Sequence, residues 1–126
     1  MLKVDRGASA WLVSGAVACV FLGVPAFAAD AIHGQELFVA CLACHTERSD
    51  ALGPSLRGVV GRRAGSLEGF RYSNAMIRSG ITWDDSNLRD YLRDPQAKVR
   101  GNHMPFSGFA QPGDADDVVA YLNTYR

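Results

Sequence analysis

The residues best suited to chemistry lie together in one short segment, Cys41-Leu42-Ala43-Cys44-His45. Residues three positions apart lie on the same face of a helix, so the two thiols can add to the two vinyl groups of one porphyrin. The imidazole that follows then reaches the iron as its proximal ligand. Cys-x-x-Cys-His is the attachment signature of c-type haem. We therefore predict one covalent haem c, attached through Cys41 and Cys44 and bound at its iron by His45.

Other kinds of site also use cysteines at this spacing. A structural zinc site needs a second pair of Cys or His ligands, and the third cysteine, Cys19, lies in an N-terminal segment that we expect to be removed. A thioredoxin-like redox pair needs a strand before its helix, and residues 46–72 show no such pattern. A simple disulfide suits an exported chain but leaves His45 without a role, and it stays open as the alternative.

The second axial ligand of the iron has to come from elsewhere in the chain. Methionine is common at this position and raises the reduction potential. Beyond residue 28 the methionines are Met76 and Met104. Met76 falls in a predicted helix, where a core role fits, whereas Met104 lies in a loop rich in glycine and proline that can fold over the far face of the haem. We predict Met104 as the ligand, with the neighbouring His103 as the alternative.

A single small domain must position these side chains in a chain of 126 residues. Residues 1–28 have a basic start, an apolar middle and a small-x-small end, which is the pattern of a signal peptide for export to the periplasm. A retained membrane anchor is the alternative, because residues 8–29 are just long enough to cross a bilayer. We expect residues 29–126 to form one domain, a monomer that contacts the membrane only if the N-terminal segment is retained.

Hydrophobic periodicity beyond residue 29 predicts an all-α fold of short helices and long loops. The expected helices cover residues 31–45, 74–79, 85–94 and 114–125, and they begin at Asp30, Ser73, Asp84 or Asp85, and Asp114. In the first helix, Ile32, Leu37, Phe38 and Cys41 form the expected buried stripe. So few apolar side chains make a marginal core, so we expect the haem to fill the middle of the domain.

The charge balance narrows the choice of partners. The chain has a formal net charge of zero, and removing residues 1–28 leaves 11 basic and 12 acidic side chains, with Lys98 as the only lysine. A strongly basic surface is therefore absent, and nucleic acid is not expected to bind.

The order of motifs over residues 31–125 resembles that of the class I c-type cytochromes, which include mitochondrial cytochrome c and soluble carriers of proteobacteria. The matching motifs are Gly34-x-x-x-Phe38, Cys41-x-x-Cys44-His45, Gly53-Pro54-x-Leu56-x-Gly58-Val59-x-Gly61-Arg62, Gly69-Phe70-x-Tyr72-Ser73-x-Ala75-Met76, Gly80-Ile81-x-Trp83, Tyr91-Leu92-x-x-Pro95, Met104-x-Phe106-x-Gly108 and Ala120-Tyr121-Leu122. The resemblance implies that the first and last helices cross, with Gly34 and Phe38 meeting Tyr121 and Leu122.

The resemblance also implies roles around the haem. The Pro54 carbonyl would accept a hydrogen bond from the free ring N–H of His45, and Tyr91 would lie near the Met104 sulfur. The groups expected at the haem propionates are Tyr72, Trp83, Arg62 and Asn102. This loop departs from the family, because Arg100-Gly101-Asn102-His103 stands where the family usually has Pro-Gly-Thr-Lys.

The function implied is that of a one-electron carrier and not of an enzyme. It would shuttle in the periplasm between a quinol-oxidising complex or a dehydrogenase and a terminal oxidase or reductase. An electron-transfer subunit of a larger oxidoreductase is the alternative, followed by a haem sensor or peroxidase. Because the lysine ring of the mitochondrial carrier is missing, we expect weak electrostatic steering toward partners.

Overall fold

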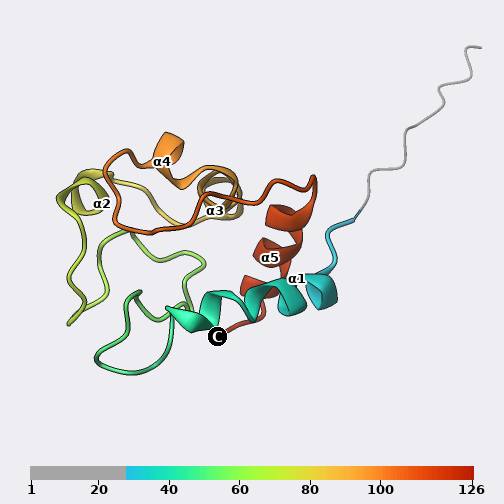
Figure 1. Ribbon diagram of the computed structural model, residues 1–126, viewed down its shortest axis with the longest axis horizontal. Coiled ribbons are helices and arrows are strands. Elements are labelled where there is room, and N and C mark those ends of the chain that lie inside the picture. The colour runs from blue at the N-terminus through green and yellow to red at the C-terminus, as the bar shows by residue number, and fades with distance from the viewer. Residues whose placement is uncertain (1–27) are drawn as a thin grey trace, which may run out of the picture.

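The protein is described by a computed structural model for residues 28–126, in which helices are joined by long loops (Figure 1). The helices are α1 (Ala31–Phe38), α2 (Asn74–Arg78), α3 (Asp85–Arg93), α4 (Pro95–Lys98) and α5 (Asp114–Leu122), and a 3-10 turn covers Cys41–Ala43. Within this range the only extended pairing is one antiparallel bridge between Arg63 and Thr82. The prediction of an all-α fold is confirmed.

The predicted signal peptide lies outside the described residues, apart from its last residue, Ala28. Among the helices that are described, none combines the length and the apolar character needed to cross a membrane.

Polar side chains cap α1, α2 and α3 where the sequence predicts them, whereas α5 begins at Asp114, as expected, without a side-chain cap. The Asp30 carboxylate accepts hydrogen bonds from the backbone N–H groups of Ile32 and His33, at 2.8 and 3.2 Å. Ser73 accepts from the Met76 N–H at 3.0 Å. At the start of α3, the Asp84 carboxylate accepts from the Asn87 N–H. These oxygens satisfy N–H groups that have no partner within the helix.

The first helix is shorter than predicted. It ends at Phe38, and the chain tightens to a 3-10 turn because the next hydrogen bonds span three residues instead of four, as in Leu42 N–H to the Val39 carbonyl. The expected buried stripe is also partly wrong, because Ile32 is 74% exposed. Helix α1 buries only the side that faces α5, where Gly34 and Phe38 lie.

Pro95 ends α3, as predicted, but it also begins a further helix, which was not expected. Asp94 accepts a hydrogen bond from the Ala97 N–H at 2.9 Å and so caps α4. Proline suits the first position of a helix because its φ angle is already helical and its missing N–H would have no partner there. The segment between the predicted helices 85–94 and 114–125, which we expect to be a loop, is therefore helical at its start.

Helices α1 and α5 cross at the right of the molecule, although they lie at opposite ends of the domain in sequence (Figure 1). A Cβ atom built on Gly34 would lie 1.9 Å from the Asp117 carbonyl oxygen, so the two backbones touch. The Phe38 ring lies 5.1 Å from the ring of Tyr121 and 5.1 Å from that of Tyr125. The predicted crossing is present, with Gly34 one turn further toward the start of α5 than expected.

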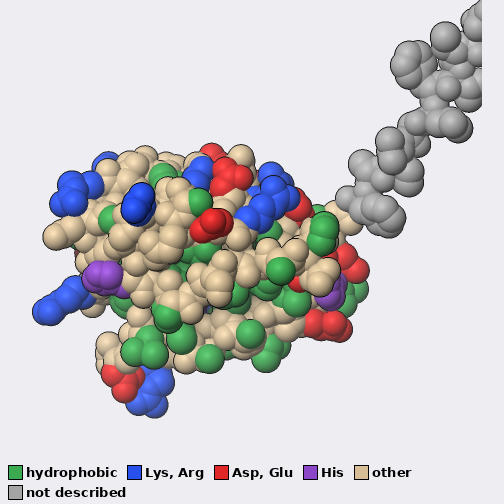
Figure 2. Space-filling model, turned by 45° about the horizontal axis from the view of Figure 1, so that its top comes forward, with side chains coloured by type: hydrophobic (Ala, Val, Ile, Leu, Met, Phe, Trp, Pro, Cys, Tyr) green, Lys and Arg blue, Asp and Glu red, His purple; other side chains and the backbone are tan. Residues whose placement is uncertain are grey.

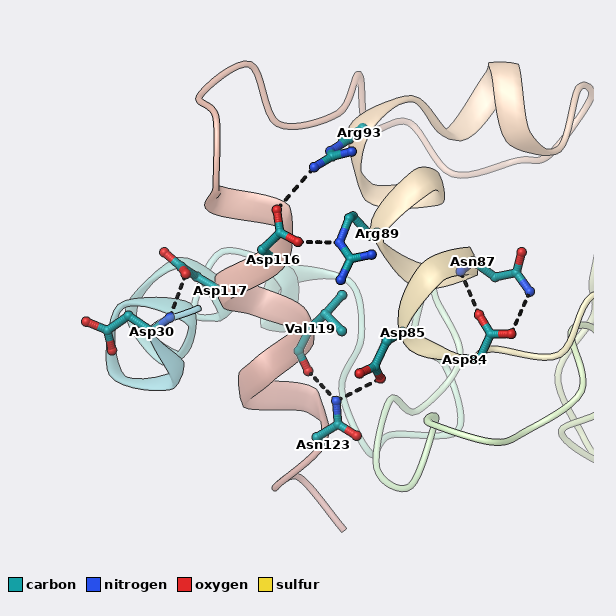
Figure 3. A network of polar contacts seen from close by, with 10 residues as sticks. All are labelled: Asp30, Asp84, Asp85, Asn87, Arg89, Arg93, Asp116, Asp117, Val119 and Asn123. Carbon is teal, nitrogen blue, oxygen red and sulfur yellow. Dashed lines mark hydrogen bonds and ion pairs between the residues drawn. The ribbon is translucent and has the colours of Figure 1, made fainter. Parts of the chain in front are cut away.

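Polar contacts also link α5 to α3 and to Asp30, the residue before α1 (Figure 3). Asp116 on α5 pairs with Arg89 and, at 3.1 Å, with Arg93, both on α3. Asp117 accepts a hydrogen bond from the Asp30 N–H at 2.7 Å. Helix α5 is thus held against both α1 and α3. The cavity described next lies beside these three helices.

Candidate functional site

A large cavity occupies the middle of the domain, where a core would otherwise lie. It measures about 1180 Å³, including the solvent at its open side. Its walls are mostly apolar and come from loops and from every helix except α4, with Phe38, Leu56, Val59, Leu88, Leu92, Val118 and Leu122 among the lining side chains. Such a cavity suits a bulky apolar group, in agreement with the expectation that a cofactor completes the core.

The two cysteines lie on the turn that follows α1. The His45 N–H donates to the Cys41 carbonyl at 2.9 Å, which closes the turn and brings all three functional side chains to one wall of the cavity. Cys41 and Cys44 are free thiols and form no disulfide with each other. Burial raises the pKa of the Cys41 thiol.

The His45 ring is held by its neighbours in one orientation. Its Nδ1 lies 2.7 Å from the Pro54 carbonyl oxygen, which can only accept, so Nδ1 carries the proton and Nε2 keeps a free lone pair. Burial lowers the pKa of His45, which favours this neutral form. The predicted contact with Pro54 is present in the structure.

Gly53 acts on the same ring, a role that the sequence reasoning missed. A Cβ atom at position 53 would lie 2.6 Å from both the Cε1 and Nδ1 atoms of His45. Only glycine leaves room for the imidazole beside this backbone. The Gly53-Pro54 pair is visible in the sequence, but no local pattern indicates that the Cα of Gly53 lies against the His45 ring.

Hydrogen-bond donors gather on the cavity wall at three of the predicted positions. Tyr72, Trp83 and Tyr91 all line the cavity, and neither hydroxyl nor the indole N–H has a hydrogen-bond partner among residues 28–126. The Trp83 and Tyr91 rings pack in a tilted arrangement with their centres 5.0 Å apart, and both are buried. Burial raises the pKa of Tyr91 to about 12, so its hydroxyl remains a donor at neutral pH.

Arg62 adds a positive charge to the same cavity. Its guanidinium donates to the Ser55 carbonyl at 2.7 Å and to the Arg57 carbonyl at 3.3 Å, which leaves other N–H groups free. A second arginine, Arg71, also lines the cavity. Unpaired donors and two cations in an apolar cavity fit a ligand that carries carboxylates, because a buried carboxylate needs such partners.

Met104 and His103 both contribute to the cavity wall, and Met76 does so as well. Met104 is partly buried, whereas His103 is exposed. The structure thus brings the predicted iron ligand and its alternative to the same cavity as His45.

Asn102 is the predicted site residue that the structure places elsewhere. It is absent from the cavity wall, and its amide nitrogen donates to the carbonyls of Pro95 and Val99, each at 2.9 Å. Both N–H groups of the amide are thus used by the protein, which leaves no donor for a propionate. The prediction that Asn102 donates a hydrogen bond to a propionate is therefore wrong.

These features together meet the needs of a c-type haem. The cavity offers two thiols on one turn, an imidazole lone pair, a thioether and a set of donors for carboxylates, all within apolar walls. A zinc site or a thioredoxin-like pair would leave the cavity and the donors without a use.

Comparison with known proteins gives a consistent result. The family model described as Cytochrome c matches residues 31–126. Cytochrome c2 of Blastochloris viridis is 42% identical over 105 residues, which cover 81% of this chain and 83% of the relative. Cytochrome c2 of Rhodoblastus acidophilus is 42% identical over 102 residues, which cover 79% and 95%. The solved structure of cytochrome cH from Methylobacterium extorquens matches with a TM-score of 0.71 and 44% identity, over 75% of this chain and 98% of that one.

Proposed function

Since the chain belongs to the cytochrome c family, has its class I fold and carries one covalently bound haem c, we propose that it is a periplasmic one-electron carrier whose iron is held by His45 and Met104. The observation that carries this proposal is the single apolar cavity that brings His45, Met104 and both free thiols together. When bound, the haem supplies a reversible one-electron change at iron.

The residues of this chain have separate tasks in that role. Cys41 and Cys44 form the thioether bonds, and the Pro54 carbonyl keeps the His45 ring in the tautomer whose Nε2 can bind iron. The thioether of Met104 favours the reduced state and so raises the potential. With both axial positions filled by protein, no substrate needs to reach the iron, which suits a carrier and not an enzyme.

The polar groups of the cavity serve the haem carboxylates in this proposal. Tyr72 and Trp83 donate hydrogen bonds to a propionate, and Arg62 offsets its charge, because an unpaired carboxylate is costly in a low-dielectric interior. Tyr91, which stays protonated, lines the same cavity as Met104, and we assign its hydroxyl as a donor to the Met104 sulfur, as the family resemblance implies. These unpartnered donors on the cavity wall support the assignment.

Export and partners complete the proposal. The signal-peptide pattern of residues 1–28 supports a mature domain of residues 29–126 in the periplasm. The donor is a quinol-oxidising complex or a dehydrogenase, and the acceptor is a terminal oxidase or reductase. Contacts with them are small and short-lived, as electron-transfer encounters generally are.

Optical spectroscopy of the isolated protein tests the ligand assignment. We expect a methionine–iron charge-transfer band in the ferric spectrum, and Met104→Ala should abolish it. Met76→Leu is the matched control, because Met76 lines the same cavity, and it should keep the band. A band that survives in Met104→Ala, or that disappears in Met76→Leu, would overturn the assignment of Met104.

Further measurements test the carrier role. Mass spectrometry should find residues 29–126 plus one haem, and the purified monomer should be reduced and reoxidised by several unrelated partners. Isolation in a tight stoichiometric complex with one enzyme would show that the chain is a subunit instead. Binding of carbon monoxide by the ferrous wild-type protein at neutral pH would indicate an open iron site and a sensor or peroxidase.

A further inference from the structure

The buried side chain of Asn102 links the backbone of Met104 to the two ends of α4. Asn102 is 6% exposed, and its Oδ1 accepts the Met104 backbone N–H at 2.9 Å. Its amide nitrogen donates to Pro95 and Val99, each at 2.9 Å. Because both N–H groups and the carbonyl oxygen are used, this one side chain links the methionine to a rigid part of the fold.

Gln96 braces the same connection from α4. Its Nε2 donates to the Asn102 carbonyl at 3.0 Å, and its Oε1 accepts the Gly101 N–H at 3.1 Å. Gly101 has a φ angle of +90°, which side chains with a Cβ rarely adopt, so the turn before Asn102 depends on glycine. The chain therefore enters the Met104 segment from a fixed position.

The segment after Asn102 has few other polar attachments. Among the described residues, the Met104 N–H bond to Asn102 is the only hydrogen bond formed by residues 103–107. The next fixed point is Phe109, whose N–H donates to the Leu92 carbonyl at 2.9 Å. Beside it, Gly108 lies so close to α3 that a Cβ would be 1.9 Å from the Arg93 carbonyl oxygen. Met104 thus lies between two anchors, and Asn102 is the nearer one.

His103 and Met104 are competing ligands because of where they lie in this segment. Successive side chains of an extended backbone point to opposite sides, so a shift of one residue exchanges the side chain that faces the cavity. Both residues already line the cavity, Met104 partly buried and His103 exposed. We propose that Asn102 is the positioning residue that selects Met104, and not His103, as the second protein ligand of the iron. This inference rests on the proposed function in that it takes Met104 to be the ligand in the wild-type protein.

The test uses the ferric haem protein with Asn102→Ala and with Asn102→Ala combined with His103→Gln. In the single variant we expect a loss of roughly half or more of the methionine–iron band, a new bis-histidine signal in electron paramagnetic resonance and a lower midpoint potential. The double variant should show no bis-histidine signal. The affinity for added imidazole, which competes with the protein ligand, should rise roughly tenfold in the double variant, because the lost hydrogen bonds no longer hold the loop. In the single variant the affinity should rise less, because His103 also competes with imidazole for the iron.

Asn123→Ala is the matched control. Asn123 donates to Asp85 at 2.9 Å and to the Val119 carbonyl at 3.0 Å, at the far end of α5 (Figure 3). Its loss should lower the unfolding midpoint but leave the band and the imidazole affinity as in the wild type. If Asn102→Ala does not yield haem protein, Gln96→Ala removes the outer brace alone, and a rise of a few-fold in imidazole affinity is then expected.

Two results would overturn the inference. One is a wild-type imidazole affinity together with an undiminished band in the Asn102→Ala protein. Where only Gln96→Ala yields haem protein, the same pair of results in Gln96→Ala would overturn the inference. The other is an Asn102→Ala spectrum that does not change when His103 is also replaced. A wild-type protein without the methionine–iron band would instead refute the proposed function, so the two failures are distinguishable.

Discussion

Two neighbouring residues and burial act on the imidazole of His45. The Pro54 carbonyl fixes the proton on Nδ1 through a contact of 2.7 Å, Gly53 leaves space beside the ring, and burial lowers the pKa so that the ring is neutral. Each of these effects favours a free lone pair on Nε2, which is the atom an iron ligand must present. The ligand strength of His45 is therefore set by residues eight and nine positions away.

Gly53→Ala should disturb this ring without removing any ligand. The new methyl group would lie 2.6 Å from the imidazole, so the ring must turn and its hydrogen bond to Pro54 must lengthen. We expect a changed midpoint potential and a perturbed haem spectrum. Gly69→Ala is the control, because it has a φ of +79° but open space around it, and it should cost about 1 kcal/mol of stability with an unchanged spectrum. Identical potentials for Gly53→Ala and the wild type would contradict this.

At the scale of elements, the crossing of α1 and α5 supports the haem-binding turn. The two backbones touch at Gly34 and Asp117, and the aromatic rings of Phe38, Tyr121 and Tyr125 fill the next turn of the crossing. Because Cys41 follows α1 after only two residues, a change in the position of α1 also moves the attachment site.

Gly34→Ala tests the close approach of the two helices. Alanine is the better helix former by about 1 kcal/mol, but its methyl group would lie 1.9 Å from the Asp117 carbonyl oxygen and force the helices apart. We expect a net loss of about 2–4 kcal/mol in the free energy of unfolding, measured by denaturant titration. Gln35→Ala, an exposed position in the same helix, should change it by less than about 0.5 kcal/mol. Equal midpoints for both variants would argue against the contact.

His33 makes the same crossing sensitive to pH. Its Nδ1 donates to the Asp117 carboxylate at 2.8 Å, and this hydrogen bond, with the charges of Asp114 and Glu36 nearby, raises the pKa of His33. Because the folded pKa is the higher one, the stabilisation is fully present below the unfolded value of about 6.5 and is lost as the pH rises through the folded value. The pKa of Asp117 is lowered by His33. The stability that this carboxylate contributes is therefore lost only in acid, below about pH 4.

The free energy of unfolding of the wild type and of His33→Gln, measured at several pH values, tests this pH dependence. The wild type should be more stable near pH 5.5, and the difference should vanish by about pH 8.5. A difference that grows with rising pH would show that the pair does not act through a protonated imidazole.

At the scale of the whole molecule, basic and acidic side chains are nearly equal in number, and several of them form close pairs. Ion pairs join Arg48 to Asp50, Lys98 to Asp90, and both Arg89 and Arg93 to Asp116. Figure 2 shows basic and acidic side chains interspersed over the upper part of the surface, with hydrophobic side chains across the lower part. No single sign of charge dominates that view, which agrees with the expectation of weak steering.

The salt dependence of electron transfer measures this balance. With a small anionic and a small cationic metal complex as reactants, the rate constants should change less than about threefold between low ionic strength and 0.15 M, because a nearly neutral surface gives little for salt to screen. A steep fall with one reactant and a rise with the other would instead show a strongly charged haem face.

Much of this architecture could be predicted from the sequence, because it depends on local signals. The helix caps at Asp30, Ser73 and Asp84 need only a polar residue before an apolar stripe, and the cysteine-histidine motif carries its own geometry. The role of Asn102 could not be predicted, since an asparagine can serve a ligand or the backbone equally well. The exposure of Ile32 was missed for a similar reason, because the width of a buried stripe depends on the neighbouring helix.

The contact between α1 and α5 also sets an order in time. The haem-binding turn is synthesised early, yet the helix α5 that supports it follows about seventy residues later in the chain. Contacts so distant in sequence form late, because the intervening loop must close first. A chain interrupted before α5 keeps its attachment motif but cannot complete the crossing at Gly34. The support of the haem-binding turn by the α1–α5 crossing therefore depends on a segment that is synthesised well after the turn itself.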